Sequence, residues 1–327
     1  MAIDKINSLG DAGSGTWRRS VKGFVPCNLL QAAVAAMRAC IPLALLTFSM
    51  QHPARMIVLG ITAVMGPAHA QTVNEIVCRA RYADLRNEFL RMSYAYTRMQ
   101  TTSELDAAGK PASKHTTRDD VQRLAGDVYL LRMEKDGKPV PAADAGHDRE
   151  KFEQARKEYE ALPESVRQAK IAKALRERTE ITEAVANAFQ FTLAGEEPIA
   201  GDTAWKIDLA PKADYQGKYP FLRDVRGTVW ISKKDYHWVR AKAETVDAIW
   251  FGFLLARFAS GLKVLFENTT VDNEVWQPSR VVYGNVSARF GLIKTFRGER
   301  EIVYSNDRKN PMKPVTVPID DPCRLPR

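Results

Sequence analysis

The sequence is poor in the residues that most often carry out catalysis or bind metals. Its 327 residues include only four cysteines and five histidines. They form no CxxC or HExxH motif, which zinc sites commonly use. No G-x-S-x-G turn and no glycine-rich phosphate loop is present either. The sequence therefore predicts no catalytic residue, no metal ligand and no cofactor, and we expect a protein that is not an enzyme.

The charge of the chain is also too uneven to indicate a polyanionic partner. The formal net charge is +9, but residues 1–70 hold six basic and two acidic side chains and so contribute +4 of it. The remaining 257 residues keep only +5. Because surfaces that bind nucleic acid need a strong local excess of Lys and Arg, we expect no nucleic-acid partner.

Residues 1–70 have the features of an export signal. The apolar run 56–65 follows Arg55 and precedes Ala68-His69-Ala70. A basic region, an apolar region and a cleavage site thus occur in the required order. We expect cleavage between Ala70 and Gln71 and a mature protein in the periplasm.

An earlier apolar stretch, residues 29–48, is interrupted by Arg38 and Pro42. A central arginine costs roughly 2.5–3.5 kcal/mol on membrane-insertion scales. We therefore favour a true start at Met50, which leaves a signal of ordinary length, over a membrane span.

The four cysteines fall into two pairs. Cys27 and Cys40 lie in the leader, whereas Cys78 and Cys323 stand near the two ends of the mature chain. In an oxidising compartment the second pair can form one disulfide that closes a very long loop. Spacing alone does not show whether the two Cα atoms come within about 7 Å. A disulfide and two unpaired thiols both stay open.

The mature chain begins with one helix and several strands. Apolar residues at helical spacing predict an amphipathic helix over residues 72–91. Alternation and aromatic residues predict strands over 92–100, 115–121 and 127–133.

A charged block follows these strands. Residues 148–162 and 164–189 are rich in Glu, Lys, Arg, Gln and Ala, which favour helix, and Pro163 separates them. Because charged residues dominate the block, we interpret residues 148–188 as a solvated helical insertion.

Beyond residue 189 the pattern is that of one strand after another. Short polar turns such as Lys233-Lys234-Asp235, and a turn over residues 195–201, separate the strands. Consecutive strands with short loops form an antiparallel meander, because parallel pairing needs long crossovers. The predicted fold class is α+β and β-rich: a single domain over residues 71–327, with a curved antiparallel sheet that forms an unclosed barrel partly covered by helices. The predicted strands cover residues 189–193, 203–209, 227–232, 237–246, 262–269, 279–290 and 296–305.

The polar residues near these strands are interpreted as structural. The acidic pairs Asp119-Asp120 and Glu196-Glu197 are expected to be exposed loop charges, since exposed carboxylates are the rule. His237 stands next to an alternating strand, and we expect a structural imidazole rather than a base.

An apolar connection, residues 248–258, joins two predicted strands where a hairpin normally has a short polar loop. It is too short to span a bilayer. It either packs into the core or forms the rim of an apolar ligand cavity or a membrane-contact loop. Its candidate ligand-binding residues are Ile249, Trp250, Phe251, Phe253, Leu254, Leu255 and Phe258.

Apolar residues at alternate strand positions predict the inner face of the sheet. Such residues either pack beneath a covering helix or, in an incompletely filled barrel, line a pocket for an acyl chain. The sequence leaves both open. The residues are Phe191, Leu193, Trp205, Ile207, Leu209, Val229, Ile231, Val264 and Phe266.

Several of these strands carry motifs that occur together in a known family. The motifs are Phe191-Thr192-Leu193-Ala194-Gly195-Glu196-Glu197, Gly227-Thr228-Val229-Trp230-Ile231-Ser232-Lys233-Lys234-Asp235-Tyr236 and Glu274-Val275-Trp276-Gln277-Pro278-Ser279-Arg280. In this order, within residues 90–308, they resemble the bacterial outer-membrane lipoprotein-sorting protein family, with its LolA/LolB-like fold. The resemblance implies an unclosed antiparallel barrel, half covered by helices, that holds the acyl chains of a lipoprotein or related lipid in transit.

The leading hypothesis is a monomeric periplasmic carrier or chaperone that buries the acyl chains of lipoproteins or related lipids without covalent chemistry. Each buried CH₂ contributes about 0.8 kcal/mol. Inner- or outer-membrane envelope proteins are its expected protein partners. The alternative is an envelope protein-interaction or structural module that uses residues 248–258. A hydrolase would require a cleft in which His237 is hydrogen-bonded to a carboxylate.

Overall fold

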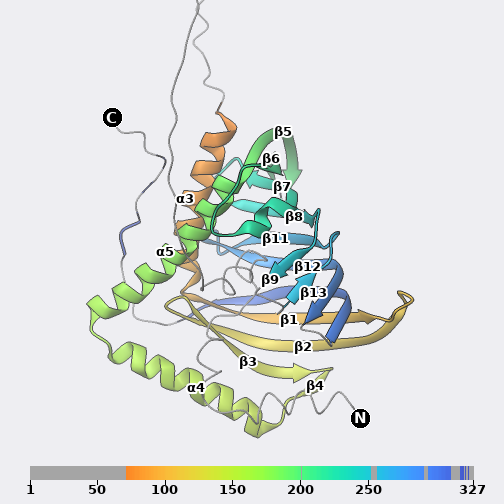
Figure 1. Ribbon diagram of the computed structural model, residues 1–327. Helices are drawn as coiled ribbons and strands as arrows, with labels where there is room; N and C mark the ends of the chain where they lie inside the picture. The colour runs from red at the N-terminus through yellow and green to blue at the C-terminus, as the bar shows by residue number, and fades with distance from the viewer. Residues whose placement is uncertain are drawn as a thin grey trace, which may run out of the picture.

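The computed structural model describes residues 71–199, 201–251, 256–290, 294–310, 317–319, 321 and 323. In this part of the chain, a 13-stranded antiparallel sheet curves around the interior and three α-helices lie against it (Figure 1). The predicted leader, with Met50 and Ala70, lies outside the described residues.

Helix α3 (Val73–Arg91) opens the described chain and confirms the helix predicted over residues 72–91. Thr72 is its N-cap, and the Thr72 hydroxyl accepts a hydrogen bond from the Glu75 backbone N–H at 3.3 Å. This contact satisfies one of the free N–H groups of the first turn. The residues that the helix buries are apolar in its first half and polar in its second half: Ile76, Val77 and Ala80, then Asp84, Asn87, Glu88 and Arg91.

The first strands pair in a way that local alternation does not predict. After α3 come β1 (Tyr94–Leu105), β2 (Pro111–Leu124), β3 (Asp127–Lys135) and the short β4 (Lys138–Pro139). Strand β1 pairs antiparallel with the last strand, β13 (Lys294–Lys309). The beginning and the end of the described chain thus meet in the middle of the sheet, which the sequence did not predict. The strands beyond residue 189 still pair largely in chain order, as the predicted meander requires.

Two helices of different character connect β4 to β5. Helix α4 (Ala142–Ala161) buries only Phe152 and Tyr159, and it packs on β3. Helix α5 (Glu164–Ala188) begins after Pro163, as the predicted break requires, and it lies beside α3 (Figure 1). Because α5 buries five residues, the interpretation of residues 148–188 as a solvated insertion is wrong for this helix.

The remaining strands complete the sheet in the order β4-β3-β2-β1-β13-β12-β11-β8-β7-β6-β5. Strands β9 and β10 form a hairpin that pairs with β12. The end strands β4 and β5 do not pair with each other in the described residues, so the predicted β-rich class with an unclosed barrel is confirmed. The bounds are β5 (Phe189–Ile199), β6 (Asp202–Pro211), the 3₁₀ helix η2 (Pro220–Asp224), β7 (Val225–Ser232), β8 (Trp238–Thr245), β9 (Ile249–Phe251), β10 (Ala256–Phe258), β11 (Lys263–Val271) and β12 (Val275–Phe290).

The turn predicted over residues 195–201 is wrong at its beginning. Strand β5 continues to Ile199, and its pairing with β6 shifts between Leu193 and Gly195. Gly195 has a φ of +132°, which side-chain-bearing residues rarely adopt. The glycine therefore marks a β-bulge rather than the start of a turn.

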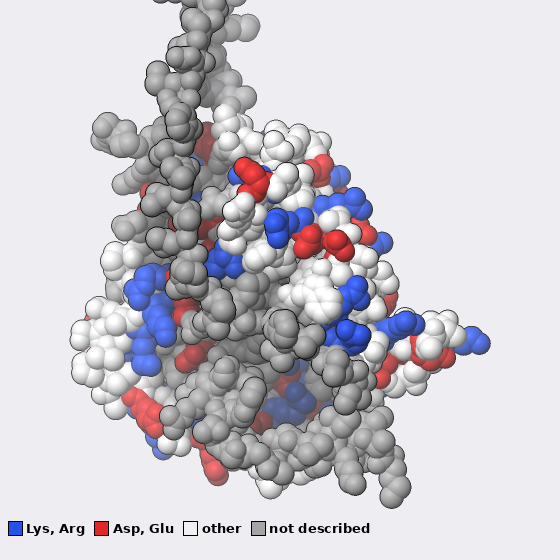
Figure 2. All heavy atoms as spheres, viewed as in Figure 1, with Lys and Arg blue, Asp and Glu red and all other residues white. Residues whose placement is uncertain are grey.

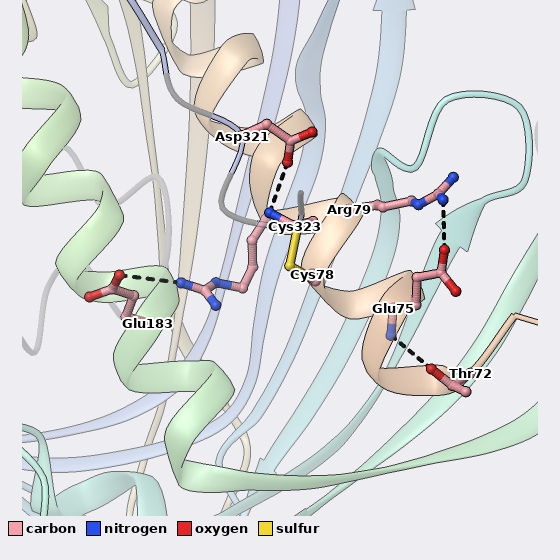
Figure 3. The surroundings of a disulfide bond; sticks show 8 residues. Thr72, Glu75, Cys78, Arg79, Glu183, Asp321 and Cys323 are labelled. Carbon is pink, nitrogen blue, oxygen red and sulfur yellow. Dashed lines mark hydrogen bonds and ion pairs between the residues drawn. A yellow bond between two sulfur atoms is a disulfide. The ribbon is translucent and has the colours of Figure 1, made fainter. Parts of the chain in front are cut away.

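A disulfide joins the two ends of the described chain (Figure 3). Cys78 of α3 is bonded to Cys323, and their Cα atoms are 5.8 Å apart. Val317 and Ile319 pack against the cluster formed by Met92 and by Ile171 and Leu175 of α5. Of the two alternatives for these cysteines, the structure has the disulfide, which holds the C-terminal segment beside α3.

None of the described helices is both long and apolar enough to cross a membrane.

Candidate functional site

A cavity of about 220 Å³ lies between the inner face of the sheet and helices α3 and α5. Its floor comes from β5, β6, β7, β8 and β11. Because alternate side chains of a strand point to the same face, residues far apart in the sequence meet there. The floor side chains are Phe191, Leu209, Val229, Ala241, Ala243, Val264 and Phe266.

Small residues at the centre of the floor leave the space unfilled. Across the strands, Ala241 lies between Val229 and Phe266, and Ala243 lies between Gly227 and Val264. A Cβ on Gly227 would come within 2.3 Å of the Lys242 carbonyl oxygen. The close approach of β7 and β8 therefore requires glycine, and no larger side chain can fill this part of the floor.

Helices α3 and α5 form the roof together, and α5 contributes Ile181, Thr182, Val185 and Ala186. Sequence reasoning missed these residues, because the helix is dominated by charged side chains. A weak signal exists: positions 171, 175, 178, 182 and 185 have the spacing of one helix face. Arg178 and Thr182 interrupt this otherwise apolar stripe and hide it.

An ion pair fixes α5 against α3 at the edge of the cavity. The Arg178 guanidinium donates two hydrogen bonds to the Asp84 carboxylate, at 2.6 and 2.5 Å, and both side chains are only 11% exposed. Burial alone would lower the pKa of Arg178, but Asp84 raises it above its ordinary value. Arg178 therefore stays charged, and the two-point contact fixes the geometry of the pair.

A second buried network continues from Asp84 along α3. Glu88 is paired with Arg123 of β2 and, at 3.4 Å, with Arg91. Burial would raise the pKa of Glu88, but Arg123 and Arg91 lower it to about 2. Arg91 also donates to the Gln277 side-chain oxygen at 3.2 Å. Helix α3 is thus anchored to β2 and β12 through charges.

The nine predicted inner-face residues share one face of the sheet but do not all line the cavity. Phe191, Leu209, Val229, Val264 and Phe266 line it. Leu193 is 44% exposed and stands beside the bulge in β5, away from the lining. The other three, Trp205, Ile207 and Ile231, pack in a closed cluster with Ile76, Val77 and Ala80 of α3.

The apolar connection at residues 248–258 is described only in part. Ile249 is 1% exposed and packs in a cluster with Phe221 and Leu222. Phe258 packs against Leu262. Trp250 is 51% exposed, with the Arg257 guanidinium 5.4 Å from its ring centroid. No described side chain of this connection lines the cavity. Phe253, Leu254 and Leu255 lie outside the described residues, and Phe251 is described only through its backbone pairing with Ala256.

The expectation of exposed loop charges is wrong for Asp119. It lies within β2, is 0% exposed, and accepts hydrogen bonds from Arg98 of β1 at 2.6 and 3.1 Å and from Arg132 of β3. Two flanking guanidinium groups compensate the cost of burying the carboxylate. Glu196 is exposed as expected, but it lies within β5 and pairs with Lys233 at 2.6 Å.

His237 lies at the edge of the cavity, with its ring centroid 5.8 Å from that of Trp276. Burial lowers the pKa of His237, while Asp235 and Asp84 act in the opposite direction. The His237 backbone N–H donates to Asp235 at 3.2 Å. Within the described residues the imidazole makes no hydrogen bond with a carboxylate, so the condition stated for a hydrolase is not met. Nor do three His, Cys, Asp or Glu side chains of this part of the chain come together to hold a metal ion.

Charges of both signs are interspersed over the described part of the face in Figure 2. Many exposed charges of the described residues are paired, as Arg280 is with Glu301 at 2.7 Å and Lys218 with Glu180 at 2.6 Å. Exposed pairs of this kind contribute little stability.

No protein-family model and no curated protein match the sequence. Among solved structures, the chain is similar to a LolA superfamily protein from Nitrosomonas europaea, with 14% identity, a TM-score of 0.31, and 75% of this chain and 96% of that chain covered. It is also similar to an outer membrane lipoprotein-sorting protein domain from Vibrio parahaemolyticus, with 10% identity, a TM-score of 0.31, and coverage of 70% and 92%. It is similar as well to the Mycobacterium tuberculosis lipoprotein LppX, with 12% identity and a TM-score of 0.27. That match covers 76% of this chain and 100% of LppX.

The first two of these structures carry the description of the family that the strand motifs resemble. At such identities and TM-scores, the likeness says nothing about a ligand. Function has to be argued from the cavity and its residues.

Proposed function

We propose that the protein is a carrier or chaperone that holds the acyl chains of a lipoprotein or a related lipid in the cavity beneath α5, without covalent chemistry. The observation that supports this is the cavity itself, whose floor brings seven apolar side chains together. Moving one CH₂ from water into such a site contributes about 0.8 kcal/mol. Ten methylenes would supply roughly 8 kcal/mol before the entropic cost of binding.

An unfilled apolar cavity is unusual inside a protein. Interiors are close-packed, and a cavity costs stability in proportion to its volume. Here the space lies where Gly227, Ala241 and Ala243 meet beneath a helix that is held by ion pairs. A ligand that filled the space would recover the missing packing contacts.

In this proposal the protein acts as a monomer in the periplasm and exchanges cargo with inner- or outer-membrane envelope proteins. The export signal that the sequence predicts before Gln71 supports this location. The disulfide between Cys78 and Cys323 supports it too, since disulfides persist in oxidising compartments. Release of the cargo would require α5 to move away from the floor.

The test is binding of a fluorescent fatty acid, with native mass spectrometry as a second readout. Ala241→Leu fills the floor of the cavity, and we expect it to weaken binding at least tenfold. Ala210→Leu adds the same volume at an exposed position of β6 and serves as the matched control. Absence of lipid binding to the wild type in both assays, or equal losses in the two variants, would contradict the proposal.

The second candidate is an envelope protein-interaction or structural module. The observation that favours it is Trp250, a large apolar side chain that is half exposed and lies outside the cavity. Trp250→Asp distinguishes the two functions. Loss of a cross-linked envelope complex with unchanged lipid affinity would favour the interaction module, whereas the carrier proposal places lipid binding at the cavity alone.

A further inference from the structure

Arg300 of β13 is a partly buried cation on the inner face of the sheet. It shares this face with Ile302 and Tyr304, because alternate residues of a strand point the same way. Its neighbours across the strands are Tyr283 of β12 and Thr102 of β1. In the described part of the chain no carboxylate pairs with the Arg300 guanidinium, and its buried Nε has no hydrogen-bond partner. A buried cation in this state is costly unless a ligand supplies the negative charge.

The charges near Arg300 add to the local excess of positive charge. Asp119 already accepts hydrogen bonds from Arg98 and Arg132. These two guanidinium groups share one carboxylate, which leaves an excess of one positive charge in this cluster. Burial lowers the pKa of Arg300, Tyr283 acts in the opposite direction, and the charge of Arg98 lowers it. An anion bound to Arg300 would relieve both lowering effects.

Arg300 lies on the same face as the cavity. Val264, which lines the cavity, pairs with Tyr283, and Tyr283 pairs with Arg300. Neighbouring strands are about 4.8 Å apart. The Arg300 backbone therefore lies about 10 Å from that of Val264, measured across the strands.

The side chain between these two points is that of Tyr283, which is partly exposed. Tyr283 and Phe266 of the cavity floor both pack against the buried cluster that contains Val281 and Ile302. A hydrocarbon chain that leaves the cavity across β12 thus passes over the Tyr283 ring before it reaches Arg300. The arrangement has one apolar end and one cationic end, as an acidic amphiphile requires.

We propose that Arg300 binds the acidic headgroup of an amphiphile whose hydrocarbon chain lies in the cavity. The inference rests on the proposed function and narrows its cargo from acyl chains in general to those that carry a carboxylate or a phosphate. Arginine suits both groups, because its planar guanidinium can donate two parallel hydrogen bonds.

The test compares three probes with the same chain: hexadecanoate, hexadecyl phosphate and hexadecanol. Displacement of a fluorescent lipid measures their affinities for the full mature chain. We expect the wild type to bind at least one of the two anions tenfold or more tightly than hexadecanol. Arg300→Met should abolish this preference and leave hexadecanol affinity within twofold, and Arg300→Lys should keep part of it.

Arg297→Met is the matched control. Arg297 lies on the same strand but on the opposite face, where it is exposed and donates to the Ala107 carbonyl oxygen at 3.3 Å. This variant should keep the preference for the anions. A preference confined to one anion supports the inference and identifies the headgroup.

The inference fails if hexadecanol binds as tightly as both anions, or if Arg300→Met keeps the preference, and in both cases the carrier proposal stands. If none of the three probes binds the wild type, the carrier proposal itself fails, and the inference fails with it.

Discussion

Helix α3 packs against the same sheet in two different ways. Its first half buries Ile76, Val77 and Ala80 against apolar residues of β6 and β7. Its second half is held by charges, with Asp84 paired to Arg178 and Glu88 paired to Arg123. Apolar contact has no preferred direction, whereas charged hydrogen bonds fix distance and angle. The polar half thus fixes the helix beside the cavity, which Asp84, Asn87 and Arg91 line, while the apolar half packs in the adjoining cluster.

Removing an ion pair from the polar half of α3 should have the largest effect on the stability of the protein. Glu88→Gln removes the carboxylate and leaves Arg123 and Arg91 as buried cations without their partner. Loss of one member of a buried ion pair costs about 3–5 kcal/mol. Urea unfolding followed by circular dichroism measures the change in the free energy of unfolding.

Glu183→Gln is the control for this variant. Glu183 is 54% exposed and lies 3.6 Å from Arg81, so its loss should cost less than about 1 kcal/mol. Equal costs in the two variants would show that the buried network does not hold the framework.

The same carboxylate predicts a dependence of stability on acid pH. The pKa of Glu88 is lowered in the folded protein from an ordinary 4.5 to about 2. Because the folded pKa is the lower one, the stabilisation is fully present above about pH 4.5 and is lost as the pH falls towards 2. The difference corresponds to roughly 3 kcal/mol.

Urea unfolding at several pH values between 6 and 2.5 checks this window. The wild type should lose more stability than Glu88→Gln over the acid part of the range. If the free energy of unfolding fell equally with pH in the two proteins, groups other than Glu88 would cause the acid sensitivity.

The smallest effect is expected at two alanines, one that lines the cavity and one in the apolar half of α3. Ala241→Leu enters the cavity and should change stability by about 1 kcal/mol or less, in the stabilising direction. Ala80→Leu adds the same atoms to a closed cluster and should destabilise by about 1–3 kcal/mol. Thermal unfolding of both variants measures the contrast. Equal destabilisation would mean that the cavity is too small to accept a side chain.

Local patterns were sufficient to predict most of the elements. Helical spacing predicts α3, alternation predicts the strands after residue 189, and Pro163 marks the break before α5. The pairing of β1 with β13 could not be predicted in this way, because it joins residues about 200 positions apart through contacts that no local window contains. The same limit applies to Cys78 and Cys323, which are separated by 245 positions.

The candidate site was predictable only in part. Alternation identified the floor residues Phe191, Val229 and Phe266, but whether they enclose a space depends on the register that brings Gly227 and Ala243 together. The burial of Asp119 could not be inferred from composition either. It depends on Arg98 and Arg132, which are 21 and 13 positions away in the chain.

The most direct test of the central claim is to locate a bound acyl chain. A long-chain fatty acid with a photoreactive diazirine at mid-chain is bound to the mature protein and illuminated, and the modified peptides are identified by mass spectrometry. The account predicts adducts on α5 around Ile181 and Val185 and on the floor strands around Val264, suppressed by excess hexadecanol. Adducts confined to the peptide that contains Trp250, or spread evenly over the surface, would contradict it.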